Sequence, residues 1–222
     1  MPSGQATLGW QTARAAAGRA TRRALQRLRG EQNIARLVAE GLQLGRETFI
    51  ARGVYLDPGF PWLITIDDQA GLSPGVIVLV HDASMHRHMG YTRLGAVVIG
   101  KRVFVGAGAI ILPGTRIGDD SIIGAGAVVR GFVPPGSLMV GNPAKPVSDV
   151  ETAADWHREA LSDAPVWPHE GWIVGRGITD ARKREQRDAL AGGVSGYLKA
   201  TPPSADDGAS DEQREDAAGV FS

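Results

Sequence analysis

The stretch "VVIGKRVFVGAGAIILPGTRIGDDSIIGAGAVVRGFV", residues 97–133, repeats with a period of six residues. One aliphatic side chain recurs at a fixed phase: Ile99, Val105, Ile111, Ile117, Ile123 and Val129. The residue four positions after each of these is mostly small: Val103, Ala109, Thr115, Ser121, Ala127 and Val133. A period of six, rich in β-branched residues and glycine, predicts a parallel β-helix in which three short strands and their turns form one triangular coil of about 18 residues.

The same period extends toward the N-terminus. Leu44, Ile50 and Leu56 share one phase, and Ile66, Leu72 and Val78 resume it after a slip near "FPWL", residues 60–63. We expect these aliphatic side chains to stack along the axis, where burial stabilises the fold by about 0.8 kcal/mol per CH₂ group. The phase breaks again after Val78, because Ser84, Gly90 and Ala96 occupy the next expected positions. We therefore predict that residues 82–97 leave the coil as an extended loop, with His81 at its base.

Composition excludes several classes of site. The chain has 222 residues, no cysteine, and 24 basic side chains balanced by 24 acidic ones. The balance gives no overall field for nucleic acid, and the lack of cysteine excludes disulfides, thiolate metal sites and a cysteine nucleophile. No apolar run has the length of a membrane span and the N-terminus does not resemble a signal peptide, so we expect a cytoplasmic protein.

Four zones follow from the pattern. The pattern predicts a basic helical arm over residues 1–41 and the β-helix over residues 42–147. It predicts a helical extension over residues 148–200 and a disordered acidic tail over residues 201–222. The arm is interpreted as packing on the main domain; the alternative is weak peripheral contact with an anionic membrane surface. The expected fold class is thus an all-β core with helical additions at both ends. Trp156, Trp167 and Trp172 are expected to pack the extension rather than stack on a sugar.

The segment from "VVIGKRVFVGAG" to "VPPGSLMVGNPAKPV", residues 97–147, resembles the hexapeptide-repeat acyltransferases, in particular the maltose, galactoside and surface-polysaccharide O-acetyltransferases. "VLVHDAS", residues 78–84, followed by a loop and a resumed "VVIG", is similar to that branch as well. The resemblance covers about residues 40–147. It implies a left-handed coil, against the usual right-handed crossover preference. It further implies acetyl-CoA as acyl donor, a sugar or other hydroxyl acceptor, and a homotrimer whose neighbouring subunit completes the site.

His81 is the leading catalytic candidate. Acetyl transfer to a hydroxyl requires that the hydroxyl lose a proton, and an imidazole titrates in the range suited to that task. The resemblance assigns the general base to the histidine just before the loop, which is His81 here. The alternative is a histidine that only caps the coil. Asp82 is a candidate to orient His81, or an ordinary turn residue.

The resemblance also marks residues for cofactor and acceptor. Ala107 in "VGAGA" and Ala125 in "IGAGA" match the groove of the acyl donor, and Lys145 in "NPAK" falls where the family has a basic residue. Arg130 and Gly131 stand where the family usually has Thr-Lys, so one basic group remains for the phosphates. Asp57, His86, His88 and Tyr91 are expected to bind the acceptor; for Asp57 the alternative is a turn-forming Asp-Pro.

His86 and His88 also raise a metal hypothesis. On an extended segment, side chains two residues apart point the same way, as zinc ligands could. The rival function is therefore a zinc-dependent lyase of the γ-carbonic-anhydrase type. It needs a third ligand, which the flanking residues do not offer, and we expect no metal. A non-enzymatic alternative is a β-helix scaffold that has lost turnover.

Overall fold

The chain divides into two compact units. A computed structural model describes residues 32–199, and the boundary between the units lies between Val147 and Ser148. Most of the arm expected over residues 1–41, namely residues 1–31, and all of the tail expected over residues 201–222 lie outside the described residues. Among residues 32–199, no helix has both the length and the apolar character needed to cross a membrane.

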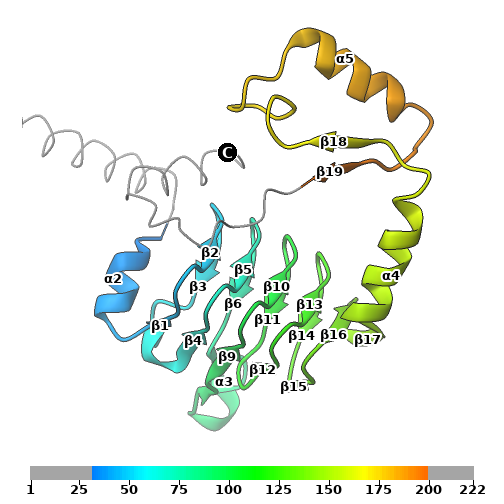
Figure 1. Ribbon diagram of the computed structural model, residues 1–222. Coiled ribbons are helices and arrows are strands. Elements are labelled where there is room, and N and C mark those ends of the chain that lie inside the picture. The colour runs from blue at the N-terminus through cyan, green and yellow to red at the C-terminus, as the bar shows by residue number, and fades with distance from the viewer. Residues whose placement is uncertain (1–31, 200–222) are drawn as a thin grey trace, which may run out of the picture. The chain divides into compact units, whose positions relative to one another are not determined.

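The first unit consists of three sheets of mostly parallel strands wound around one axis (Figure 1). Sheet A contains β1 (Gln43–Leu44), β4 (Ile64–Ile66), β9 (Val97–Ile99), β12 (Arg116–Ile117) and β15 (Phe132–Val133). Sheet B contains β2 (Phe49–Ile50), β5 (Gly71–Leu72), β10 (Phe104–Val105), β13 (Ile122–Ile123), β16 (Ser137–Val140) and β17 (Lys145–Asp149). Sheet C contains β3 (Tyr55–Leu56), β6 (Ile77–Val78), β11 (Ile110–Ile111) and β14 (Val128–Val129). The chain visits the sheets in the order A, B, C, which confirms the predicted parallel β-helix.

The repeating aliphatic residues form the core. Ile99 pairs with Ile117, Val105 with Ile123, and Ile111 with Val129, each partner lying one regular coil of 18 residues later. All six of these side chains are at most 2% exposed, which confirms that the period-six phase faces the axis. The small residues four positions later are buried as well, including the two polar ones, Thr115 and Ser121. Their hydroxyls donate to backbone carbonyls, so no bare polar group enters the core.

Coil length is regular except at one corner, which we call the C–A corner because the chain passes there from sheet C to sheet A. Leu44 pairs with Ile66, 22 positions later, and Leu72 with Val105, 33 positions later. The first two coils are therefore longer than a regular coil of 18 residues. The extra residues lie between β3 and β4, where the 3₁₀ helix η1 (Pro61–Leu63) forms, and between β6 and β9.

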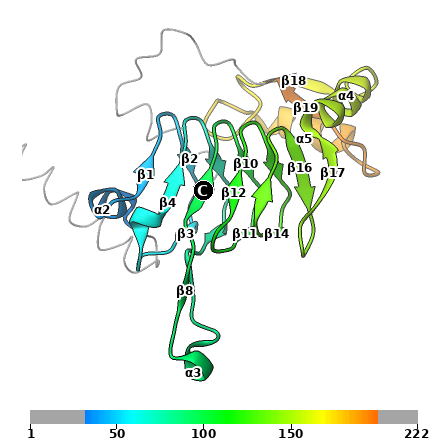
Figure 2. The same cartoon turned by 90° about the horizontal axis from the view of Figure 1, so that it is seen from below.

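The second insertion is a hairpin. β7 (His81–Asp82) pairs antiparallel with β8 (Arg93–Leu94), and the four-residue helix α3 (His86–Met89) lies at its tip. Figure 2 shows this hairpin standing away from the coils. The structure corrects the extended loop expected over residues 82–97, because the excursion contains regular elements and Val97 already lies in β9, buried in the core.

The first coil is covered by helix α2 (Ile34–Ala39), as Figure 1 shows. Leu37 of this helix and Leu42 just after it are buried in the same core cluster as the axial aliphatic residues. The Gln32 amide bonds both the N–H and the C=O of Leu56, a residue of the edge strand β3, at 2.6 Å and 2.7 Å. These contacts satisfy backbone groups that an open edge would leave unpaired.

The second unit contains α4 (Val150–Ala160), α5 (Asp180–Ala189) and a parallel pair of strands, β18 (Val166–Pro168) and β19 (Tyr197–Lys199). Trp167 is 8% exposed, and its ring lies 5.9 Å from that of Trp172. These two tryptophans pack the extension as expected, whereas Trp156 on α4 is 58% exposed. The strand pair was not expected, because its two strands are separated by a whole helix.

The axial stack generates a test of the fold. We expect Ile111→Ala to lower the free energy of unfolding by about 2–5 kcal/mol, because it leaves a cavity in a closely packed axis. Arg116→Ala, on the exposed face of sheet A, should change it by less than about 0.5 kcal/mol. Urea titrations of both variants at one protein concentration measure the difference. Equal midpoints would contradict an axial position for Ile111.

Candidate active site

His81 begins the hairpin at the C–A corner, and its ring is held by a carboxylate from the coil before. The Nδ1 atom of His81 forms a short hydrogen bond with Oδ2 of Asp57. The two side chains differ sharply in exposure, with 37% of His81 and 1% of Asp57 accessible. The pair therefore has a buried carboxylate behind an imidazole that faces solvent.

Asp57 is fixed by further hydrogen bonds. Its Oδ2 also accepts from the backbone N–H of Val80 at 3.2 Å, and its Oδ1 accepts from that of Gly59 at 3.1 Å. A buried carboxylate without such partners would be costly. Because an ionised carboxylate can only accept, Nδ1 of a neutral His81 carries the proton and Nε2 carries the lone pair. Within residues 32–199, no protein group bonds to Nε2.

The structure exchanges the expected roles of the two aspartates. Asp57 was expected to bind the acceptor, but its buried carboxylate is occupied by His81 and two amides. Asp82 was expected to orient His81, but its exposed carboxylate accepts instead from the Ser84 amide at 2.9 Å. The hydrogen bonds from the Ser84 backbone and side chain hold the pKa of Asp82 below its usual range. Asp82 thus caps a turn, and Asp57 is the carboxylate that bonds to the His81 ring.

The other candidate residues of the hairpin lie on the short helix α3 or just after it. His86 and His88 lie on α3, where residues two apart do not face each other, so their side chains diverge. This corrects the expectation that both point the same way. Tyr91 is 76% exposed. Among residues 32–199, no group of three His, Asp or Glu side chains is arranged to hold a metal ion.

The sequence analysis missed an aromatic residue beside His81, Phe60, and a second aromatic residue, Trp62, that packs on Phe60. The Phe60 ring lies 5.6 Å from the His81 ring, and the Trp62 ring lies 5.7 Å from that of Phe60. Both belong to the first insertion, so the only signal in the sequence was the phase slip at "FPWL". That slip was interpreted as an irregularity of the coil, not as part of a site.

The residues matched to the acyl donor lie on two corners. Ala107 and Ala125 are exposed one coil apart on the B–C corner, where the chain passes from sheet B to sheet C, and the Gly126 N–H bonds the Ala107 carbonyl at 2.8 Å. Arg130 follows β14 at the C–A corner, the corner of His81. Lys145 begins β17, and both basic side chains are exposed. Sequence similarity alone does not reveal this division between corners.

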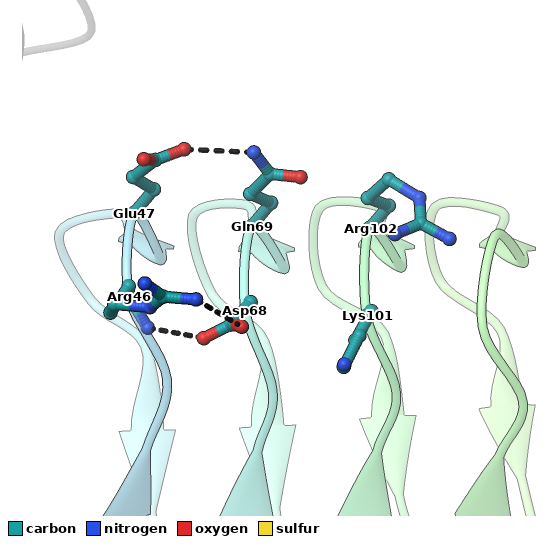
Figure 3. A pocket seen from close by; sticks show the side chains of 6 residues that line it. All are labelled: Arg46, Glu47, Asp68, Gln69, Lys101 and Arg102. Atoms are coloured by element: carbon teal, nitrogen blue, oxygen red, sulfur yellow. Dashed lines mark hydrogen bonds and ion pairs between the residues drawn. The ribbon is translucent and has the colours of Figure 1, made fainter.

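A shallow polar depression marks the third corner, between sheets A and B (Figure 3). Its side chains pair with each other along the coils: Arg46 with Asp68, and Glu47 with Gln69. Arg102, on the next coil, pairs with Asp120. The hydrogen bond from the Arg46 amide, followed by that from its guanidinium, lowers the pKa of Asp68. These partners satisfy one another, and we assign the depression a role in stacking the coils.

Comparison with known families agrees with this architecture. Residues 96–131 match the family model described as bacterial transferase hexapeptide (six repeats). This segment of the chain is therefore similar to the hexapeptide-repeat transferases. The matched segment contains the regular coils that follow the hairpin, so it includes neither Asp57 nor His81.

The names of proteins with similar sequences propose that they are acetyltransferases. A protein from Staphylococcus aureus (strain Mu50) is 35% identical over 126 residues, which are 56% of this chain and 62% of the relative. One from Bacillus subtilis (strain 168) is 34% identical over 102 residues, which are 46% of this chain and 57% of the relative. The chain thus spans less than two thirds of these relatives.

A solved structure is similar to part of this chain. A hexapeptide-repeat-containing acetyltransferase from Vibrio cholerae, crystallised with acetyl coenzyme A, is 29% identical with a TM-score of 0.44. The similarity covers 50% of this chain and 61% of that one.

The geometry of the pair predicts the tautomer of His81. In the neutral ring the proton should reside on Nδ1, because Asp57 accepts there. Asp57→Leu removes the acceptor, and the proton should then redistribute toward Nε2. Two-bond ¹H–¹⁵N correlation spectra of the imidazole rings measure the tautomer in both proteins. A His81 ring protonated on Nε2 in the unaltered protein would contradict the arrangement.

Proposed function

We propose that this protein is an acetyl-CoA-dependent O-acetyltransferase that acts on a hydroxyl of a sugar or of a surface-polysaccharide precursor. One observation carries the proposal: a histidine oriented by a buried carboxylate stands open to solvent at the base of the hairpin. The names of the sequence relatives support acetyl transfer as the reaction. His81 is the proposed general base, and Asp57 is its positioning residue.

The reaction needs one base and no covalent enzyme intermediate. Nε2 of His81 accepts the proton of the acceptor hydroxyl as the hydroxyl oxygen attacks the thioester carbonyl carbon. A C–O bond forms, the carbonyl π electrons move to oxygen, and a tetrahedral intermediate results. Collapse of that intermediate breaks the C–S bond, and the leaving sulfur takes the proton from the imidazolium. The products are the acetyl ester and free coenzyme A, and His81 returns to its neutral form.

The buried carboxylate stabilises the charged ring in this cycle. Asp57 has no access to water that could screen it, so its negative charge acts strongly on the imidazolium formed at His81. It also keeps Nε2 directed away from the coil. Both effects are needed at the moment of proton transfer, when the ring gains a positive charge.

The proposed donor site uses the corner of small residues and the basic groups. Ala107 and Ala125 offer an open backbone edge along which an extended pantetheine arm can lie. Arg130 and Lys145 are exposed cations suited to the phosphates of coenzyme A. On the acceptor side, we propose that His86, His88 and Tyr91 of the hairpin contribute polar contacts.

We propose a homotrimer as the active assembly. The outer faces of sheets B and C carry apolar side chains in successive coils, among them Phe104 and Ile122 on sheet B and Ile77, Ile110 and Val128 on sheet C. Such continuous apolar faces favour burial against another subunit. A neighbouring subunit would also supply a second wall to a His81 site that is open on one side.

Substitution of the base tests the mechanism. We expect His81→Ala to lower kcat by about 10²–10⁴, the usual contribution of a positioned general base. The affinity for coenzyme A should not change, because His81 acts on the acceptor. Thiol release from acetyl-CoA in the presence of a panel of sugars measures turnover. His86→Ala and His88→Ala serve as controls on the same hairpin and should mainly alter the acceptor KM. Full activity of His81→Ala would remove the proposed mechanism.

The same assay separates the rival zinc lyase. A chelator should leave acetyl transfer unchanged, whereas a zinc enzyme would lose activity and contain about one metal per site. Losses of similar size in all three histidine variants, together with chelator sensitivity, would favour the metal hypothesis.

The assembly has a separate test. Sedimentation velocity should show a species of three chains, and Ile110→Glu on the outer face of sheet C should shift it toward the monomer, because the change buries a charge at the interface. Lys101→Glu, at the polar A–B corner, is the matched control and should leave the trimer intact. A fully active monomer would refute this assembly.

A further inference from the structure

The two insertions that interrupt the coil leave from the same corner, one coil apart. The first carries η1, with Phe60 just before it and Trp62 within it, and the second starts at His81. The regular coils that follow have no insertion at this corner. The aromatic residues of the first insertion are therefore brought to the proposed base by the stacking of coils.

The aromatic rings extend outward from the base. Phe60 is half-buried, and its ring is tilted by 58° to that of His81 at a centroid distance of 5.6 Å. Trp62 meets Phe60 edge to face, at 5.7 Å and 76°. The Trp62 side chain is 56% exposed, so the row of rings begins at His81 and ends in solvent. A large aromatic surface exposed next to a reactive group is typical of a ligand contact.

The position of Trp62 is set by its backbone. Pro61 is buried at the start of η1, and the Leu63 N–H bonds the Phe60 carbonyl at 3.0 Å. Gly41 approaches so closely that a Cβ on it would lie 2.9 Å from the Cβ of Trp62. Gly41 also has a φ of +108°, which favours glycine. The backbone and Cβ of Trp62 are thus held in place before any ligand arrives, which reduces the entropy lost on binding.

This arrangement selects the shape of the acceptor. The molecule must present a hydroxyl to Nε2 of His81 and, beside that hydroxyl, an apolar surface to the rings of Phe60 and Trp62. A pyranose ring does both, because its axial C–H bonds form an apolar face while its hydroxyls lie at the edge. An acyclic polyol has the same hydroxyls but no rigid apolar face. Packing of the C–H face on the indole would fix which hydroxyl reaches the base.

We infer that Trp62, backed by Phe60, is the acceptor platform and that the acceptor presents a pyranose ring. The inference rests on the proposed function for the reaction itself, but binding at the platform can be measured without turnover. Trp62 is a specificity-determining residue that contacts the acceptor and moves no proton. Its contribution should appear for ring-shaped acceptors only.

Binding of defined sugars tests the platform directly. Ligand-observed saturation-transfer NMR on the full chain would use methyl glucopyranoside, methyl galactopyranoside and methyl mannopyranoside, with glucitol as the acyclic probe. We expect at least one pyranoside to bind and glucitol to bind at least about tenfold more weakly. Trp62→Ala should weaken the pyranoside by about tenfold or more, whereas Trp62→Phe should retain most of the affinity because it keeps an aromatic face.

Controls separate a local effect from loss of the fold. Trp156→Ala removes a tryptophan of nearly equal exposure, 58% against 56%, from the other unit and should leave binding unchanged. Thermal melts of all variants should coincide, since both side chains are largely exposed. In turnover assays, Trp62→Ala should raise the pyranoside KM and leave the acetyl-CoA KM unchanged.

Each outcome decides one hypothesis. Binding that is equal in Trp62→Ala and the unaltered protein, equal loss in Trp156→Ala, equal binding of glucitol, or no binding of any pyranoside would each overturn the platform. Pyranoside binding that depends on Trp62, without acetyl transfer to any acceptor, would sustain the platform and refute the proposed enzymatic function. Acetyl transfer that does not change in Trp62→Ala would refute the platform and sustain the proposed enzymatic function.

Discussion

The parallel hydrogen-bond ladder between successive coils is the interaction on which the rest of this molecule depends. The Gly106 N–H bonds the Ile123 carbonyl at 2.7 Å, and the Gly124 N–H bonds the Met139 carbonyl at 2.8 Å one coil on. The ladder brings backbones so close that a Cβ on Gly106 would lie 2.6 Å from the Ala125 nitrogen. Glycine at this position is therefore a condition of the stacking. The ladder also sets the strand register, which places one aliphatic side chain over the next along the axis.

A frame held together along its strands leaves its corners free to vary. Lengthening a corner costs only the slowly growing entropy of loop closure, and it breaks no ladder bond. Both large insertions lie at the C–A corner, and the ladder resumes correctly after each. The consequence is local: residues 24 positions apart in sequence, Asp57 and His81, become hydrogen-bonded neighbours. The candidate site thus lies where the repeat is least regular.

The candidate site combines a buried charge with exposed reactive and apolar groups. Asp57 can remain buried because two amides and the His81 ring satisfy its oxygens. His81 stays partly exposed. Phe60 lies against the His81 ring and contacts the exposed Trp62, so the imidazole has an apolar neighbour. Asp57, His81 and the aromatic pair of Phe60 and Trp62 are brought together by two insertions in successive coils.

The sequence by itself determined the β-helix, its axial residues and the position of His81 beside an insertion. These features can be predicted from the sequence because a period of six is a local property. Each six-residue unit from Ile99 to Val129 carries one aliphatic residue that must be buried. Only the tertiary structure decided that Asp57 rather than Asp82 bonds to His81, that α3 turns His86 away from His88, and that Phe60 lies between the His81 contact and Trp62. These contacts join different coils or depend on the fold of an insertion, which lies outside the repeat. Their geometry is set by the length of each corner and by the stacking of one coil on the next, and neither quantity can be determined from a single unit of the repeat.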